Sequence, residues 1–353
     1  MNKTEFFEED LYQESIEHSI EEKDSIPSEV LTFNASYSLP EYADKFRRKV
    51  FLRPEFQRNS VWNIKGKSRF IESILFNYPI PQVFLYKTLD KEQYLIVDGF
   101  QRITAISEFL NNEFKLKGVN NKFDGLGFSD LSEDTQEKLR SHQLNACMIR
   151  QITPNDVQTL YYIFERLNTG GQNLNNMEVR RAVNYGPLIK MLEDINVSNE
   201  NWRKILGTDV NKRFLDTELL LRILAFSEKW DPQAKIVSGY ESMKSFLNEF
   251  CHKNQYYDKP EFKSKLAKVS EKVIRELGEK PFTVYTRYNY VLLDSVLSAL
   301  IIIKKDVKCL DVKFEKLKQD PEFKQILEAK QGTISVKNVN KRIERAIEIF
   351  SHD

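Results

Sequence analysis

The sequence predicts an α+β protein in two parts, a small mixed α/β domain followed by an all-helical domain. A chain of 353 residues is long for one domain, and two compact units are expected. Strand-like and helix-like apolar patterns alternate up to about residue 186, whereas only helical spacing follows. We therefore divide the chain into residues 1–30, an acidic arm, residues 31–186, the mixed domain, and residues 187–353, the helical domain.

Composition supports folded domains in a reducing compartment. Hydrophobic residues make up 41% of the chain, enough for a substantial core. No apolar run approaches the length of a membrane span, and the N-terminus lacks a basic stretch followed by an apolar one, so neither a membrane segment nor a secretory signal is expected. Cys147, Cys251 and Cys309 lie far apart, which argues against a disulfide framework or a zinc cluster. We expect a cytoplasmic protein.

The charge is distributed unevenly. Residues 1–30 hold ten acidic side chains against two lysines, a net charge of −8, and the whole chain carries +1, so the remainder carries +9. A mildly basic body behind an acidic arm is compatible with nucleic-acid contact, the arm then competing for the site. The other interpretation is a solubilising leader.

Each element of the mixed domain has a local signal. Ser38 before Pro40 marks the start of a helix that runs to Lys49. Prolines and short polar turns then separate strands from helices. The expected order is a strand at 50–52, a helix at 67–77, strands at 82–89 and 93–97, a helix from 99 to 110, a strand at 145–152, and helices at 154–167 and 176–185.

Apolar residues recur at helical spacing throughout the last part of the chain. The pattern has no fixed repeat length, which argues against a solenoid. The expected helices cover residues 215–229, 240–251, 261–277, 288–304 and 338–350.

The most informative segment is the junction at Asp98-Gly99, where a buried strand ends and a helix begins at once. The first N–H groups of such a helix and its positive dipole end favour an anion. Gly99 would let phosphate oxygens approach the backbone, and Arg102 could clamp them. Asp98 would repel a bare phosphate, so its functional use would be to hold Mg²⁺ or to orient water.

A purely structural role for Asp98 fits the same residues. Asp98 and Gln101 have the spacing of a capping box, in which Asp98 would cap the helix. The residues alone leave both interpretations open.

Two further segments carry polar groups that suit a binding cleft. Arg53, Gln57 and Arg58 leave a strand on a loop with interleaved aromatics; they suit a phosphate or a base, or else an arginine packs on Trp62. Later, Arg166 and Asn168 end a helix near a loop that could line a cleft. The Gly170-Gly171 pair there is more simply a helix C-cap, and Asn175 or Asn176 is expected to cap the next helix.

Taken together and in order, these segments resemble the ParB-like, sulfiredoxin-like N-terminal domain of GmrSD-type restriction proteins, which act on modified DNA. The similarity extends over roughly residues 31–350, with segments similar to the family's helical continuation at 217–222 and 333–342. Its four ordered motifs are Pro54 to Trp62, Ile71 to Pro81, Val97 to Arg102, and Phe164 to Glu178.

The resemblance implies a bacterial anti-phage protein with a nucleotide pocket that binds and hydrolyses a nucleoside triphosphate with Mg²⁺. Carried over, it makes Asp98, Gln101 and Arg102 the catalytic candidates and Asp98 the candidate Mg²⁺ ligand, with Arg58 and Asn168 as pocket walls. The full expected nucleotide-binding set is Arg53, Gln57, Arg58, Asp98, Gly99, Gln101, Arg102, Arg166 and Asn168.

Two departures from the family limit what the resemblance implies. Phe100 replaces a glutamine of the motif, which puts hydrolysis in doubt more than binding. No HNH pattern is present, and the four histidines are widely separated, so nuclease activity of this chain alone is not expected. The first hypothesis is an NTP-dependent regulatory module that acts with DNA and with a nuclease from another chain. The alternative is a non-enzymatic DNA-binding or scaffold protein of the same fold.

Overall fold

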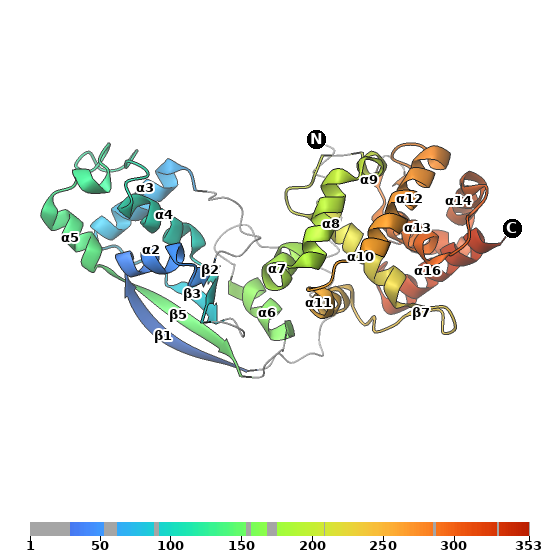
Figure 1. Ribbon diagram of the computed structural model, residues 1–353, viewed down its shortest axis with the longest axis horizontal. Coiled ribbons are helices and arrows are strands. Elements are labelled where there is room, and N and C mark those ends of the chain that lie inside the picture. Colours follow the sequence, from blue (N-terminus) through green and yellow to red (C-terminus); the bar gives the residue numbers. More distant parts are fainter. Residues whose placement is uncertain are drawn as a thin grey trace. The chain divides into compact units, whose positions relative to one another are not determined.

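The computed structural model describes residues 29–52, 62–87, 92–152, 157–167, 175–207, 209–284, 287–329 and 332–352. The chain divides after residue 174 into two compact units (Figure 1). We call them the N-terminal unit and the helical unit. The predicted order, a mixed α/β region followed by a helical one, is confirmed.

A five-stranded mixed sheet forms the centre of the N-terminal unit, with the strand order β1-β5-β3-β4-β2. β1 and β5 pair antiparallel, as do β3 and β4, whereas β5 with β3 and β4 with β2 run parallel. The strands are β1 (Val30–Ser38), β2 (Phe51–Leu52), β3 (Val83–Lys87), β4 (Tyr94–Asp98) and β5 (Gln143–Gln151).

Helices cover this sheet. Figure 1 shows α2 to α5 gathered on one side of it, and α6 lies against β4. Leu85, Ile96 and Met148 of the strands share a buried cluster with side chains of the covering helices. The helices are α2 (Leu39–Arg47), α3 (Ile64–Leu75), α4 (Phe100–Leu110), α5 (Glu133–Ser141) and α6 (Val157–Leu167), with a 3-10 turn at Phe128–Asp130.

Local signals explain where the first helices begin. Ser38 accepts a hydrogen bond from the Glu41 N–H, and the Glu41 carboxylate accepts one from the Ser38 N–H at 2.7 Å, which forms a capping box. Asn63 caps α3 by accepting from the Gly66 N–H at 3.0 Å, so α3 starts at Ile64, earlier than the apolar spacing predicts. Strand β1 and helix α5 were not predicted.

In the described part of the chain, the helical unit has ten helices, and the central one, α13, is buried over nearly its whole length. Helices α10 and α16 lie against α13. Two short antiparallel ladders, β6–β7 and β8–β9, interrupt the helices, so the unit is not entirely helical. The helices are α7 (Asn176–Asn184), α8 (Pro187–Ser198), α9 (Glu200–Leu206), α10 (Leu215–Lys229), α11 (Met243–Asn254), α12 (Pro260–Leu277), α13 (Tyr290–Ile302), α14 (Leu310–Gln319), α15 (Pro321–Leu327) and α16 (Val336–Ser351), and the strands are β6 (Trp230–Asp231), β7 (Ile236–Val237), β8 (Thr283–Val284) and β9 (Arg287–Tyr288).

Helix α7 belongs to this unit by packing, because Met177 is fully buried in its core. The division after residue 174 therefore lies before α7, whereas the sequence suggested a division near residue 186.

A buried ion pair fixes α16 against α13. The Arg342 guanidinium contacts both carboxylate oxygens of Asp294, and it also donates to Ser295 Oγ at 2.8 Å and to the Val291 carbonyl at 3.0 Å. Arg342 and Asp294 are both fully buried. Breaking such a pair leaves an uncompensated buried charge, so the pair specifies how the two helices meet.

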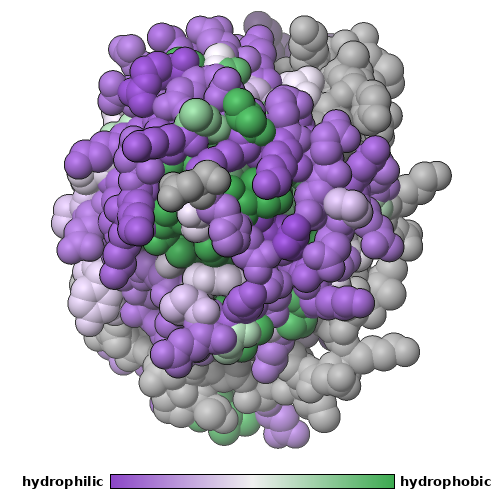
Figure 2. Space-filling model, turned by 90° about the vertical axis from the view of Figure 1, so that its right-hand side faces the viewer, coloured by the Kyte–Doolittle hydropathy of each residue, from purple (hydrophilic) through white to green (hydrophobic). Residues whose placement is uncertain are grey.

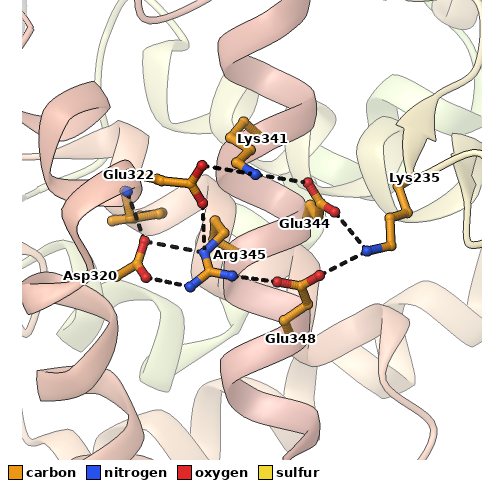
Figure 3. Close-up of polar contacts among 8 residues, drawn as sticks. Lys235, Asp320, Glu322, Lys341, Glu344, Arg345 and Glu348 are labelled. Carbon is orange, nitrogen blue, oxygen red and sulfur yellow. Dashed lines mark hydrogen bonds and ion pairs between the residues drawn. The ribbon is translucent and has the colours of Figure 1, made fainter.

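The outer side of α16 carries a second, solvent-facing set of ion pairs (Figure 3). Arg345 binds Asp320, which caps α15, and donates to Glu348 at 2.6 Å. Lys235, after β6, donates to Glu344 and Glu348 at 2.8 Å each. Figure 2 looks at this end of the helical unit and shows a largely hydrophilic face with apolar side chains between the charged ones.

Candidate functional site

The predicted junction between a strand and a helix is present. β4 ends at Asp98, and α4 begins at Phe100. Between them Gly99 has φ +99°, in the left-handed region that favours glycine. A Cβ at this position would lie 2.9 Å from Cγ2 of Val83 on β3, so the tight approach of the two strands also requires glycine here.

Asp98 does not cap α4. The N-cap position is taken by Gly99, and no side chain makes a capping hydrogen bond there. Instead, Asp98 Oδ2 accepts a hydrogen bond from Arg102 Nη2 at 2.5 Å, one turn along the helix. The capping-box interpretation of Asp98 is therefore wrong.

Arg102 is the buried member of this pair. Its side chain is 10% exposed, against 34% for that of Asp98. Its other terminal nitrogen, Nη1, donates to the carbonyl of Pro81 at 2.5 Å. The guanidinium thus holds Asp98 to the segment leading into β3, and the more exposed carboxylate is the group that a ligand can reach.

Burial also determines the protonation state of the nearby Tyr42 on α2. Burial raises the pKa of the Tyr42 phenol above its usual range, and the positive charge of Arg102 opposes this only in part. The phenol therefore stays neutral and donates to the Leu144 carbonyl at 3.3 Å.

Gln101 connects the junction to the chain that precedes α3. Its Oε1 accepts a hydrogen bond from the Trp62 N–H at 3.3 Å. The Trp62 ring packs against Phe70 of α3, with the ring centroids 5.6 Å apart. Three predicted site residues, Arg53, Gln57 and Arg58, come just before Trp62, in a stretch outside the described residues.

The Phe100 side chain points into the core. It is 4% exposed and packs edge-to-face against Phe46 of α2, at 5.9 Å between ring centroids. A glutamine at this position would have to occupy the same apolar environment. Phe100 therefore belongs to the core beneath the junction and not to the polar groups around Asp98.

The last predicted residues lie at the end of α6. Arg166 is exposed, and its guanidinium lies 6.0 Å from the Tyr162 ring centroid on the same helix. Asn168, with Gly170 and Gly171, falls outside the described residues. Contact between α6 and β4 brings the helix that carries Arg166 onto the strand that ends at Asp98.

Asn175 caps α7, as one of the two predicted alternatives. Its Oδ1 accepts from the Glu178 N–H at 2.8 Å, and the Glu178 carboxylate accepts from the Asn175 N–H at 2.8 Å. The glutamate of the fourth motif therefore has a structural role, which its spacing from Asn175 could have indicated.

The second motif contributes a contact that the sequence analysis missed. Prolines here were expected to separate a helix from a strand and to belong to the second motif, but the Pro81 carbonyl also accepts a hydrogen bond from Arg102. Sequence offered no direct signal for this contact, because any residue supplies a carbonyl.

Within the described ranges, no group of three or more His, Cys, Asp or Glu side chains could hold a metal ion. Asp98 alone would be a weak site, because Mg²⁺ prefers about six oxygen ligands. A cation at Asp98 would need further oxygens, such as those of phosphates. In the described part of the chain, no helix is long and apolar enough to cross a membrane.

Residues 39–185 match the family model for the GmrSD restriction endonuclease N-terminal domain. The matched segment contains the Asp98 junction and extends from α2 through α7. The predicted resemblance is confirmed for this segment, while the stretches at 217–222 and 333–342 lie beyond it.

A solved structure, the C2221 form of a Pnob8-like ParB-N domain, is similar at 12% sequence identity. The match covers 92% of this chain and 100% of that one, with a TM-score of 0.23, which is too low to support an inference about the fold. No curated protein matches the chain.

Proposed function

We propose that the N-terminal unit binds a nucleoside triphosphate with Mg²⁺ at the Asp98 junction, as a regulatory module of a modification-dependent restriction system. The match of residues 39–185 to the GmrSD N-terminal domain supports the restriction role. The observation that carries the nucleotide proposal is a carboxylate held by a buried arginine where a strand meets a helix N-terminus.

The backbone supplies the anion-binding part of the proposed site. The N–H groups of the first turn of α4 lie at the positive end of the helix dipole, which favours an anion there. Gly99 has no side chain to keep phosphate oxygens away from them. Triphosphate oxygens at this position would also complete the coordination of a cation on Asp98.

Asp98 and Arg102 have different roles in this proposal. Arg102 contacts Asp98 Oδ2, which leaves Oδ1 to bind Mg²⁺ or to orient a water molecule. Because Arg102 is buried and its two terminal nitrogens bind Asp98 and Pro81, it acts as a positioning residue and not as a phosphate clamp. This revises the clamp expected from sequence.

The test compares nucleotide binding by the wild-type chain, Asp98→Asn and a matched control, Glu133→Gln, an exposed carboxylate on α5. Calorimetry with each of the four ribonucleoside triphosphates is run with Mg²⁺ and with EDTA. We expect Asp98→Asn to bind at least about tenfold more weakly in Mg²⁺, equivalent to about 1.4 kcal/mol, and to lose the response to EDTA. Glu133→Gln should behave as the wild type.

Asp98→Asn also removes the negative partner of a mostly buried arginine, which destabilises the fold. Binding is therefore measured at a temperature where circular dichroism shows both proteins folded. If no nucleotide binds the wild type, or if Asp98→Asn retains full Mg²⁺-dependent affinity, the nucleotide proposal is wrong. DNA binding that persists unchanged without any nucleotide affinity would favour the scaffold alternative.

We propose that the nuclease activity of the restriction system belongs to a partner chain and not to this one. Purified protein is expected to leave plain and modified plasmid DNA intact in Mg²⁺ or Mn²⁺. Nicking that is lost in Asp98→Ala would show instead that the Asp98 junction itself cleaves DNA.

A further inference from the structure

Strand β1 is an edge strand of the sheet among the described residues. It lies at the end of the strand order and pairs only with β5 among the described strands. Its first half is open on both faces, since all four residues from Leu31 to Asn34 are exposed. In Figure 1 this end of the β1–β5 ribbon extends past the helices α2 to α5.

Two large apolar side chains lie on this open half. Leu31 is 54% exposed and Phe33 is 53% exposed. Side chains alternate along a strand, so both lie on the face where Ala35 and Tyr37 pack against the core. Leu31 and Phe33 therefore continue the apolar face of the sheet beyond its covering helices.

The strand lacks the usual protection of an edge. Natural edge strands carry charges, prolines or bulges that prevent pairing with another chain. Residues 30–38 (VLTFNASYS) contain no charged residue and no proline, and the β1–β5 register is regular throughout. Two copies of this strand can meet without like-charge repulsion.

We propose that β1 is a dimer interface, through which two copies of this chain pair edge to edge in antiparallel orientation. A two-fold axis at Thr32 places each Leu31 opposite the partner copy's Phe33 and the two Thr32 residues opposite each other. A cross-strand pair of two threonines is favourable, and each Leu31–Phe33 pair removes apolar surface of both copies from water.

This register is selected by the pattern of exposure. It confines the overlap to residues 30–34, the half of β1 that is open, and pairs every large exposed apolar side chain with another one. A shift of one residue in each copy would place Leu31 against Ala35, which already packs against its own core. The result is a continuous sheet of ten strands with an isologous interface.

Sedimentation velocity of the full chain tests the dimer. The wild type is expected to reach a dimer at tens of micromolar. Phe33→Lys should weaken association at least tenfold, because it introduces a charge at the shared edge. The matched control is Val312→Lys on α14, where the wild-type side chain is 63% exposed, and it should leave association unchanged.

A cysteine crosslink tests the register. In a background of Cys147→Ser and Cys309→Ser, Thr32→Cys should form an intermolecular disulfide, because directly opposed residues in a sheet lie within disulfide range. Ser36→Cys on the same strand should not, since the two copies of residue 36 would be roughly 25 Å apart.

A wild type that stays monomeric at about 100 µM would overturn the proposal. A dimer that is insensitive to Phe33→Lys, or one in which Ser36→Cys crosslinks and Thr32→Cys does not, would equally show that the copies meet elsewhere. Phe33 is half-exposed, so its substitution should not prevent folding, and thermal melting checks this.

Discussion

Replacing Gly99 by alanine tests the strand–helix junction directly. The alanine would be held at φ +99°, which costs an L-residue roughly 1–2 kcal/mol. Its Cβ would also meet Cγ2 and Cγ1 of Val83 at 2.9 and 3.1 Å, an overpacking that costs about 1–3 kcal/mol. We therefore expect Gly99→Ala to destabilise the N-terminal unit by about 2–5 kcal/mol.

The two contributions can be separated with Val83→Ala. Removing the valine methyl groups relieves the two closest contacts of the new Cβ, leaves Val83 Cβ at 3.2 Å and does not change the backbone strain. The double variant should therefore be more stable than the sum of the two single effects by about 1–3 kcal/mol.

The assay is amide hydrogen exchange of peptides covering residues 94–110, which reports on β4 and α4 separately from the helical unit. The wild type, the two single variants and the double variant form a complete cycle. A Gly99→Ala protein within 0.5 kcal/mol of the wild type, the ordinary spread for a neutral surface change, would refute the strain argument. If the destabilisation of the double variant equals the sum of the two single effects, the proposed contact with Val83 is refuted.

Three further predictions concern the helical unit. Arg342→Met should lower the free energy of unfolding by about 3–5 kcal/mol, because Asp294 is left charged and buried, and chemical denaturation measures the loss. Asp294→Leu added to it should restore much of the stability; no recovery would argue against the ion pair. The Arg345 hydrogen bond holds the pKa of the Asp320 carboxyl below its usual range, so its stabilisation is complete above about pH 5 and is lost as the pH falls through the lowered pKa. Asp320→Asn, which retains a cap, should therefore differ most from the wild type near neutral pH and least in acid; a pH-independent difference in melting would contradict this. Asn175→Ala should lower the free energy of unfolding by about 0.5–2 kcal/mol in the same denaturation assay. Asn175→Asp should also lose stability, because it keeps the capping oxygen but loses the Nδ2 group that donates to the Arg213 carbonyl at 2.9 Å; an unchanged Asn175→Ala protein would contradict the capping role.

Sequence predicted best where one residue type fits only one backbone conformation. Asp98-Gly99 predicted the turn between β4 and α4, because glycine favours positive φ. Ser38 before Pro40 predicted the start of α2, since a capping side chain followed by proline suits a first helical turn.

Two elements were missed for different reasons. The β1 segment does have a strand pattern, because Leu31 and Phe33 alternate with polar residues. Only the helix start at Ser38 was predicted in this region. Helix α5 has one buried residue, Leu139, so no apolar periodicity could reveal it.

The roles of Asp98 and Arg102 could not be predicted. Asp98 has Gln101 three residues later and Arg102 four residues later, so the spacing fits both a capping box and an ion pair. The conformation of Gly99 decides between them, because it takes the N-cap position itself. Only the folded structure shows that Nη1 of Arg102 donates a hydrogen bond to the Pro81 carbonyl.

The position of β5 has a consequence for synthesis of the protein on the ribosome. β5 is the last strand of its sheet to be translated, yet it lies between β1 and β3. Until Gln143, the partner of Ser38, leaves the exit tunnel, β1 has no neighbouring strand of its sheet to pair with, and its first residue, Val30, waits for Gln151. Domains usually fold as units during translation, so a nascent chain that stalls before this point exposes β1 to other chains. Once β5 has left the ribosome, it pairs with one edge of β1 and protects that edge from other chains.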